Sequence, residues 1–356
     1  MFVVRPAQLD DLDKLMKLAR DKAPGMTTFP STEEKFAERL QQSVSSFADP
    51  ADLSKLSHYL LVLEDLETGN IAGTSALIVG IGLDKPFYSY RILHHTQTCS
   101  EPPVRVDTEL LQLSNDFVGA TEVATLFLDP EYRQEKYRPE KLGKLVSQAR
   151  YLLMASHMDR FPNRVVAEIR GWVDDKSNSP FWDAIGRHFF GLDFYEADDI
   201  NGQGNSQFIS DLMPTFPIYS AILPEAAQAV IGRPHDGAVP AVKLLEREGF
   251  HFSGAVDIFD AGPLYEARTD TITSVRNSIE GTLAGSVEGG QSEHTHLAAN
   301  VDIASFRVAA TSVVEGSSGL WLPEGAASAL QVSEGSKIRY ISLDTGKGYA
   351  AKGKAQ

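Results

Sequence analysis

A cluster of positive charge stands out between residues 133 and 144 of this sequence. Five basic residues occur there against two glutamates, although the formal net charge of the chain is −15. The basic residues are Arg133, Lys136, Arg138, Lys141 and Lys144. A predicted strand precedes the segment and a predicted helix follows it, and a helix N-terminus offers unpaired N–H groups and a positive dipole end to a phosphate. The cluster therefore predicts a pyrophosphate site for a nucleotide-like cofactor, with a solvated, charged helix start as the alternative.

A histidine in a loop is the second candidate for chemistry. His235 lies in the segment RPHDG, directly before a predicted helix. Loops on a rigid scaffold carry a disproportionate share of site residues, and a histidine side chain can donate or accept a proton close to neutral pH. His235 is therefore a candidate for proton transfer, and the alternative is an ordinary surface histidine.

Composition excludes several classes of function. The 356 residues are 42% hydrophobic and 23% charged, which is typical of a folded soluble protein. The net charge of −15 disfavours nucleic-acid binding, which needs clustered positive charge. The single cysteine, Cys99, allows no disulfide framework within the chain and fits a reducing compartment. The first residues lack the apolar core of a signal peptide and no apolar run is long enough to span a bilayer, so we expect a cytoplasmic protein without membrane association.

Apolar periodicity predicts the elements that must position these residues. The predicted strands cover residues 2–5, 59–64, 71–81, 122–128, 164–169 and 255–260. The predicted helices cover an apolar stripe from residue 12 to residue 19 and residues 33–45, 140–157, 180–190, 224–232 and 240–248. Residues 87–113 are expected to form irregular strands and loops. Hairpin strands combined with β-α-β crossovers predict an α+β fold, with a mixed sheet flanked by helices.

Two segments in the second half of the chain look alike. Segments 179–194 and 239–252 each read as a helix opened by proline and closed by glycine, followed by an aromatic residue that leads into a strand. They indicate either a weak internal duplication or the chance use of common cap residues.

The spacing of the basic segment resembles a motif of the GNAT acetyltransferases. These enzymes carry R/Q-x-x-G-x-G/A after their fourth strand, where it holds the pyrophosphate of coenzyme A. This chain has Arg138 at the first position, Lys141 in place of the first glycine and Gly143 at the second. Lys141 departs from the motif, although its charge can partly compensate. The segment is a few residues longer than the family pattern, so Arg133 is a second candidate for the first position.

Longer runs resemble the arginine N-succinyltransferases from residue 2 to about residue 270. Among them are GMTTFP, LSNDFVGATEVATLFLDPEYR, SPFWDAIGRHFFGLDF and EAAQAVIGRPH, in that order along the chain. The resemblance implies a GNAT-like fold, with an acyl-CoA-binding unit at residues 1–200 and a second half at 201–280 that carries the loop histidine. Composition predicts a polar linker at 281–296, a small all-β appendage at 297–345 and a disordered tail at 346–356.

The same resemblance implies a reaction and its site. Enzymes of this family transfer the succinyl group of succinyl-CoA to the α-amino group of L-arginine, the first step of arginine degradation by the succinyltransferase pathway, without a metal or redox cofactor. Leu126 is implied to contact succinyl-CoA, and His235 to be the proton donor. The expected residues for the co-substrate are Leu126, Leu128, Arg138, Lys141, Gly143 and Lys144. The family also implies a homo-oligomer or a hetero-oligomer with a related subunit.

Both substrates carry charges that require partners. An arginine guanidinium needs acidic side chains, and the candidates are Asp116, Glu168, Asp257 and Asp260. The succinyl carboxylate needs a cation or N–H donors, for which Arg170 and the region of Ser179 are options. Two other functions stay open. One is a GNAT enzyme with another amine such as ornithine or another acyl-CoA, and the other is a catalytically inactive GNAT-like binding subunit.

Overall fold

The computed structural model describes residues 1–22, 32–174, 178–202, 207–288 and 295–343. The expected tail at 346–356 and the run GMTTFP lie outside these residues. Among the described residues, no helix combines the length and the apolar character needed to cross a membrane.

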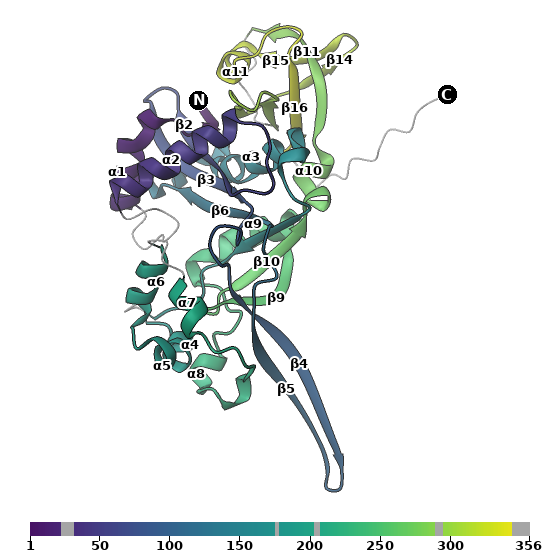
Figure 1. Cartoon of the computed structure of the whole chain (residues 1–356). Helices are drawn as coiled ribbons and strands as arrows, with labels where there is room; N and C mark the ends of the chain where they lie inside the picture. The colour runs from purple at the N-terminus through teal and green to yellow at the C-terminus, as the bar shows by residue number, and fades with distance from the viewer. Residues whose placement is uncertain (23–31, 175–177, 203–206, 289–294, 344–356) are drawn as a thin grey trace.

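The described strands form one long mixed sheet (Figure 1). The strands are β1 (Phe2–Pro6), β2 (Ser57–Asp65), β3 (Asn70–Val79), β4 (Ser89–Ser100), β5 (Pro103–Ser114), β6 (Thr121–Leu128), β7 (Arg164–Glu168), β8 (Ile218–Tyr219), β9 (His251–Asp257), β10 (Pro263–Arg268), β11 (Ile279–Val287), β12 (His296–Asn300), β13 (Val308–Thr311), β14 (Val314–Gly316), β15 (Gly319–Pro323) and β16 (Lys337–Ser342). Their order is β14-β15-β11-β16-β12-β13-β1-β2-β3-β6-β7-β10-β9-β4-β5-β8. The pairs β6–β7 and β11–β15 are parallel, so the predicted α+β fold with a mixed sheet is confirmed.

Helices cover this sheet on both faces. They are α1 (Leu12–Lys22), α2 (Glu33–Ala48), α3 (Leu142–Ser156), α4 (Pro180–Ala184), α5 (Gly186–Phe190), α6 (Phe194–Gly202), α7 (Gln207–Leu212), α8 (Glu225–Gln228), α9 (Val239–Arg247), α10 (Thr273–Asn277) and α11 (Glu324–Leu330).

The two faces of β2 show why helices pack on both sides. Successive strand residues point to opposite faces, and β2 is apolar at both sets of positions. Leu60 and Val62 join the core formed with α1 and α2. Leu61 and Leu63 join the core on the other face, together with the apolar stripe of α3. The central strands are therefore buried on both faces, which explains their continuous apolar runs.

Strands β6 and β7 pair only at their beginnings. The parallel register joins Thr121 to Val165 and Glu122 to Val166, and no further pair of the two strands is in register. On its other side, β6 carries a bulge against β3 at Thr125, which has a positive φ of 53° and whose carbonyl accepts a hydrogen bond of 2.9 Å from Thr74 Oγ1. A bulge bends a strand and changes its twist. The strands therefore separate after Glu122 and leave a space between them.

A long hairpin projects from one end of the molecule (Figure 1). Strands β4 and β5 pair along their full lengths, so the expectation of irregular strands and loops at 87–113 is wrong. Most side chains of the outer half are exposed on both faces. The apolar alternation that identifies a half-buried strand is therefore missing from its sequence.

The C-terminal unit, which contains β11, β14, β15, β16 and α11, lies at the opposite end of the molecule from the hairpin (Figure 1). Residues Ile279–Val287 form β11, which contradicts the predicted linker at 281–296 for that part, and residues 289–294 lie outside the described ones. The unit also contains α11, whose alanines and Leu330 pack on its sheet, so it is not all-β.

Two predicted helices are shorter or interrupted. The segment 180–190 forms α4 and α5 with a break at Ile185, and the aromatic ring of Trp182 lies so close to Gly186 that an added Cβ would be 2.2 Å from it. Phe194 begins α6 instead of a strand, whereas α9 leads into β9 as predicted. The two similar sequence segments therefore do not share a local fold. The helix predicted at 224–232 covers only Glu225–Gln228.

Candidate active site

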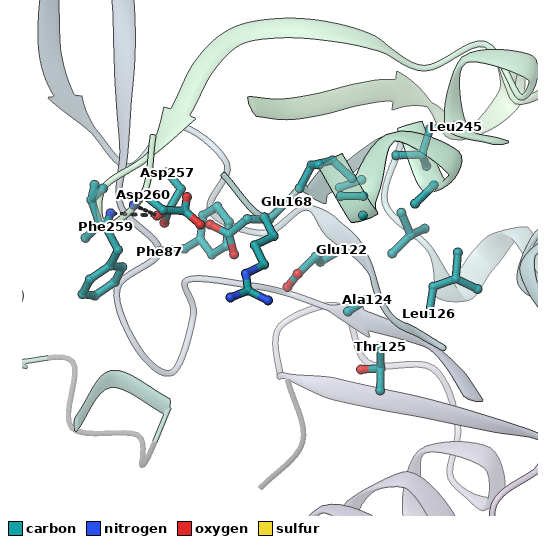
Figure 2. Close-up of a pocket in the computed structure, with 18 of the residues that line it drawn as sticks. Phe87, Glu122, Ala124, Thr125, Leu126, Glu168, Leu245, Asp257, Phe259 and Asp260 are labelled. Carbon is teal, nitrogen blue, oxygen red and sulfur yellow. Dashed lines mark hydrogen bonds between the residues drawn. The ribbon is translucent and has the colours of Figure 1, made fainter. Parts of the chain in front are cut away.

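A cavity of about 550 Å³ opens where β6 and β7 separate. Its walls include residues 122–126 of β6, the end of β7 and the residues that follow it, part of α3, one side of α9 with the two residues before it, and the turn between β9 and β10. Figure 2 shows Leu126 and Leu245 toward one side of the cavity and Asp257 and Asp260 at the other. The cavity thus has an apolar side and an acidic side.

The acidic side consists of three carboxyl groups, here called the acidic cluster: Glu168, Asp257 and Asp260 (Figure 2). Burial, and then the neighbouring Glu168 with which it shares a hydrogen bond, raise the pKa of Asp257 well above its usual range. Burial and then the charge of Asp257 raise the pKa of Asp260 to about 8. Crowded carboxylates hold protons because their like charges repel, so a bound cation would favour their ionised form.

The turn between β9 and β10 holds the two aspartates in place. The carboxylate of Asp257 accepts hydrogen bonds from the backbone N–H groups of Phe259 and Asp260 at 2.7 and 2.9 Å. The carboxylate of Asp260 accepts from Gly171 and Gly262 at 2.7 and 2.8 Å. A Cβ on Gly171 would lie 2.4 Å from the Asp260 carbonyl oxygen. Glycine at 171 therefore permits the close approach that joins the end of β7 to this turn.

Glu122 adds a fourth carboxyl group to the cavity, on β6. Burial raises the pKa of Glu122 to about 7, and the positive charge of Arg39 on α2 acts in the opposite direction. A carboxyl group with a pKa near the working pH is suited to accept a proton.

His235 is not among the residues that line the cavity, but it lies beside them, in the loop before α9. Its backbone N–H donates to the carbonyl oxygen of Arg170 at 2.8 Å, and a β-bridge joins Gly171 to Pro234 beside it. The ring Nδ1 accepts a hydrogen bond of 3.0 Å from the N–H of Gly237. Because Nδ1 accepts, the neutral ring carries its proton on Nε2. Gly237 and the next residue, Ala238, line the cavity itself.

The predicted phosphate segment forms two 3₁₀ turns before α3, Pro130–Arg133 and Glu135–Glu140. Lys141 then takes a left-handed conformation with a φ of 51° and directly precedes α3. The first hydrogen bonds of the helix run from the N–H groups of Lys144 and Leu145 to the Lys141 carbonyl. The N–H groups of Leu142 and Gly143 precede this first bond, as donors at a helix N-terminus do.

The basic side chains of this segment have different surroundings. Arg133 donates to the Leu128 carbonyl at 2.8 Å, and Arg138 pairs with Glu135 at 2.9 Å on the surface. Lys144 donates to the Leu343 carbonyl at 3.0 Å. An added Cβ at Gly143 would meet no atom within 4 Å, so space is open beside the helix start.

Other expected site residues fall inside and outside the cavity. Leu126 and Arg170 line it, whereas Leu128 packs against the core beside α3. Asp116 is not among the lining residues; it pairs with Arg91 and, at 3.9 Å, with Arg164. Ser179 is buried and caps α4 by accepting from the Trp182 N–H at 3.1 Å. Asp116 thus has its partners outside the cavity, whereas Ser179 also donates to the Phe259 carbonyl at 3.2 Å and so supports the turn that carries the acidic cluster.

Sequence reasoning missed Glu122 and Arg150, which both line the cavity. Arg150 is only 2% exposed and lies on α3. A signal for it was present in the sequence. Arg150 follows Val146 by four residues and precedes Leu153 by three, so it falls on the apolar stripe of the helix. A charge at such a position indicates a buried cation that needs an explanation.

Comparisons with known proteins agree with this architecture. Residues 2–274 match the family described as "Arginine N-succinyltransferase beta subunit", and residues 280–342 match its C-terminal domain. The chain is 37% identical to "Arginine N-succinyltransferase" of Photorhabdus laumondii over 345 residues, covering 96% of this chain and 98% of the relative. It is 37% identical to the protein of the same description from an Escherichia coli strain over 346 residues, with the same coverage of both chains.

A solved structure has the same fold. The structure described as arginine/ornithine succinyltransferase subunit AI from Pseudomonas aeruginosa aligns with a TM-score of 0.84 at 32% identity, covering 96% of this chain and 98% of the other. The family match over most of the length and the identity to full-length relatives lead to one conclusion. This chain belongs to the arginine N-succinyltransferase family.

Proposed function

We propose that this protein transfers the succinyl group of succinyl-CoA to the α-amino group of L-arginine and releases CoA. The observation that carries the proposal is one cavity that joins the splayed strands β6 and β7 to the acidic cluster, with the loop of His235 bonded to the lining residue Arg170. The names of the relatives support the donor and the acceptor. The α3 N-terminus, with Lys141 and Gly143, is the proposed site for the pyrophosphate of CoA.

The acidic cluster is the proposed site for the guanidinium of arginine. A guanidinium is planar, always charged and able to donate two parallel hydrogen bonds to a carboxylate. Glu168 is the most exposed of the three carboxyl groups and lies beside Asp257. Asp260 accepts two backbone N–H groups and supports the turn. We therefore assign the direct contact to Glu168 and Asp257, and the positioning of that contact to Asp260.

The acceptor amine must be neutral before it attacks. Glu122, whose pKa burial raises to about 7, is the proposed group that takes a proton from the arginine ammonium. The amine nitrogen then forms a bond to the thioester carbonyl carbon, and the carbon–sulfur bond breaks. The departing thiolate takes the proton from Nε2 of His235, the nitrogen that carries it when Nδ1 accepts from Gly237. Nε2 is protonated again by the second proton, which the amine nitrogen loses as the amide forms, so His235 ends the reaction neutral.

Negative charge develops on the carbonyl oxygen during the attack. Backbone N–H groups aimed at that oxygen stabilise it. Strand β6 has left β7 by this point, and its bulge at Thr125 turns the backbone beside Leu126. The N–H groups around Leu126 are the proposed donors, and the acyl group of succinyl-CoA is proposed to lie along this strand.

Ornithine is the alternative acceptor, because the related Pseudomonas aeruginosa structure is described as an arginine/ornithine succinyltransferase. An ammonium on a shorter side chain cannot make the paired hydrogen bonds of a guanidinium. Thiol release from succinyl-CoA should therefore be measured with L-arginine and with L-ornithine at equal concentrations. The proposal predicts a higher kcat/KM for arginine. Turnover only with ornithine would reject the acceptor, and thiol release with neither would favour a binding subunit.

The expected absence of a metal or redox cofactor, the cytoplasmic location, and assembly with itself or a related subunit stay predictions.

A further inference from the structure

Arg150 is a buried cation that the reaction described above does not use. Its side chain is 2% exposed and lines the cavity from α3. Its Nε donates to the Ser147 carbonyl at 3.1 Å, and one terminal nitrogen donates to Ser147 Oγ at 3.4 Å. Its guanidinium also lies 5.4 Å from the ring centre of Tyr151. These partners come from its own helix, and they leave part of the guanidinium fork unused.

The charge of Arg150 has no direct acidic partner. Among the described residues, no carboxylate lies within ion-pair distance of its guanidinium. Glu248 acts on it only over a longer range. Glu248 is itself occupied, because it accepts from Gln148 and from the N–H and hydroxyl of Ser274, each at 2.8 Å. Burying an unpaired cation is costly, so an anion that enters the cavity would be stabilised there.

The position of Arg150 suits the acyl end of the donor. It lies eight residues after the first residue of α3, which is roughly 12 Å along the helix at about 1.5 Å per residue. Glu248, whose charge acts on Arg150, closely follows Leu245 in sequence. Figure 2 shows Leu245 and Leu126 across the cavity from Asp257 and Asp260. Arg150 reaches the cavity from α3, whereas Asp257 and Asp260 reach it from the end of β9 and the turn that follows, so the cationic and acidic groups belong to different walls of one cavity.

We propose that Arg150 binds the terminal carboxylate of the acyl donor and so selects a dicarboxylic acyl-CoA over a neutral one. This inference rests on the proposed function, because it concerns the donor of the same reaction. A succinyl group carries an anion beyond the thioester, whereas the butyryl group has a methyl group at nearly the same place. Arg150 is thus a specificity residue, and it takes no part in the proton transfers.

The test compares succinyl-CoA with butyryl-CoA as donors to L-arginine, in the wild type and in Arg150→Met. In the wild type we expect kcat/KM for succinyl-CoA to exceed that for butyryl-CoA by about 100-fold or more. Arg150→Met should lower kcat/KM for succinyl-CoA by about 30- to 100-fold and change that for butyryl-CoA by less than about threefold. Methionine fills a similar volume, and such replacements of buried charges are often tolerated.

A matched control is Arg307→Met. Arg307 is half-buried with a pKa that burial lowers, and it donates to the Ala329 carbonyl at 3.1 Å, but it lies outside the cavity. This variant should keep the donor ratio of the wild type, which is kcat/KM for succinyl-CoA divided by kcat/KM for butyryl-CoA. If Arg150→Met does not fold, Arg150→Lys replaces it. The ammonium keeps the charge without the planar fork, so its donor ratio should fall between those of the wild type and unity.

Each outcome decides between the two roles of Arg150. Equal losses with both donors in Arg150→Met, or an unchanged ratio in Arg150→Lys, would show a structural role and overturn the inference while leaving the proposed function intact. A wild-type enzyme that prefers butyryl-CoA would instead reject succinyl-CoA as the donor, and the assignment of Arg150 with it. The two failures are therefore distinguishable.

Discussion

The backbone N–H of His235 donates a hydrogen bond of 2.8 Å to the carbonyl oxygen of Arg170. This bond fixes the histidine loop to the chain that leaves β7, next to the acidic cluster. Residues from the two halves of the chain thus meet just beyond the end of β7, in the interior of the sheet order. The relationship explains how a loop far along the sequence can take part in chemistry between β6 and β7.

Replacing His235 should separate its proton transfer from its role as a helix cap. Its ring accepts from Gly237 at the start of a short 3₁₀ turn. Asparagine can also accept there but cannot transfer a proton near neutral pH. Both His235→Ala and His235→Asn should lower kcat by about 100- to 10,000-fold, with succinyl-CoA binding retained. If His235→Asn were active while His235→Ala was not, His235 would serve only as a helix cap.

Replacing Glu168 should weaken arginine binding more than it slows turnover. In Glu168→Gln the shape is kept and the charge that attracts the guanidinium is lost. We expect KM for L-arginine to rise about 10- to 100-fold, as measured by initial rates at saturating succinyl-CoA. Asp116→Asn is the matched control, because Asp116 pairs with Arg91 outside the cavity. A similar KM effect in both variants would argue against a specific guanidinium site.

Protein stability should depend on pH through Asp260. Its pKa in the folded protein is about 8, above the ordinary value of 3.8, so the folded state binds the proton more tightly than the unfolded state. Between these values the unfolded chain loses this proton first, and its contribution to stability falls as pH rises toward 8. Denaturant unfolding should be measured from pH 5 to pH 9. The free energy of unfolding should fall less with rising pH in Asp260→Asn than in the wild type, even though the variant is less stable at pH 5. The same slope in both proteins would contradict the assigned pKa.

Replacing Gly143 with alanine should test the proposed pyrophosphate site at the start of α3. Nothing lies within 4 Å of the position that an added Cβ would take, and alanine favours a helix over glycine by roughly 0.5 to 1 kcal/mol. Gly143→Ala should therefore keep or raise the melting temperature while KM for succinyl-CoA rises. Gly171→Ala is the contrasting variant, because its Cβ would clash with Asp260 and lower the stability. An unchanged KM in Gly143→Ala would exclude close contact with the phosphate.

The sequence was sufficient for elements whose apolar pattern reflects burial. The strands β1, β2, β3, β6 and β7 and the helix α3 were predicted because each has an apolar run or stripe that packs in a core. The hairpin of β4 and β5 was not predicted, because its outer half is exposed on both faces and therefore has no apolar alternation. The break in the helix after Trp182 depends on a ring that packs on Gly186, a tertiary contact without a local signal.

The candidate site could be predicted only in part, for a similar reason. Leu126 and His235 were identified from the family resemblance, and their roles stay predictions. The chain has 48 acidic residues, and only the topology shows that Glu168, Asp257 and Asp260 converge whereas Asp116 pairs elsewhere. Arg150 was overlooked because one charge in a strong apolar stripe does not change the prediction of a helix.

The most direct test of the proposed function is the product of the complete reaction. Purified protein should be incubated with succinyl-CoA and L-arginine, and the product analysed by tandem mass spectrometry together with the amount of free CoA. We predict arginine with a succinyl group on its α-nitrogen, formed in equal amount to CoA. A succinyl group on the guanidinium, or CoA release that does not depend on arginine, would contradict the arrangement of the donor, the acidic cluster and His235 proposed here.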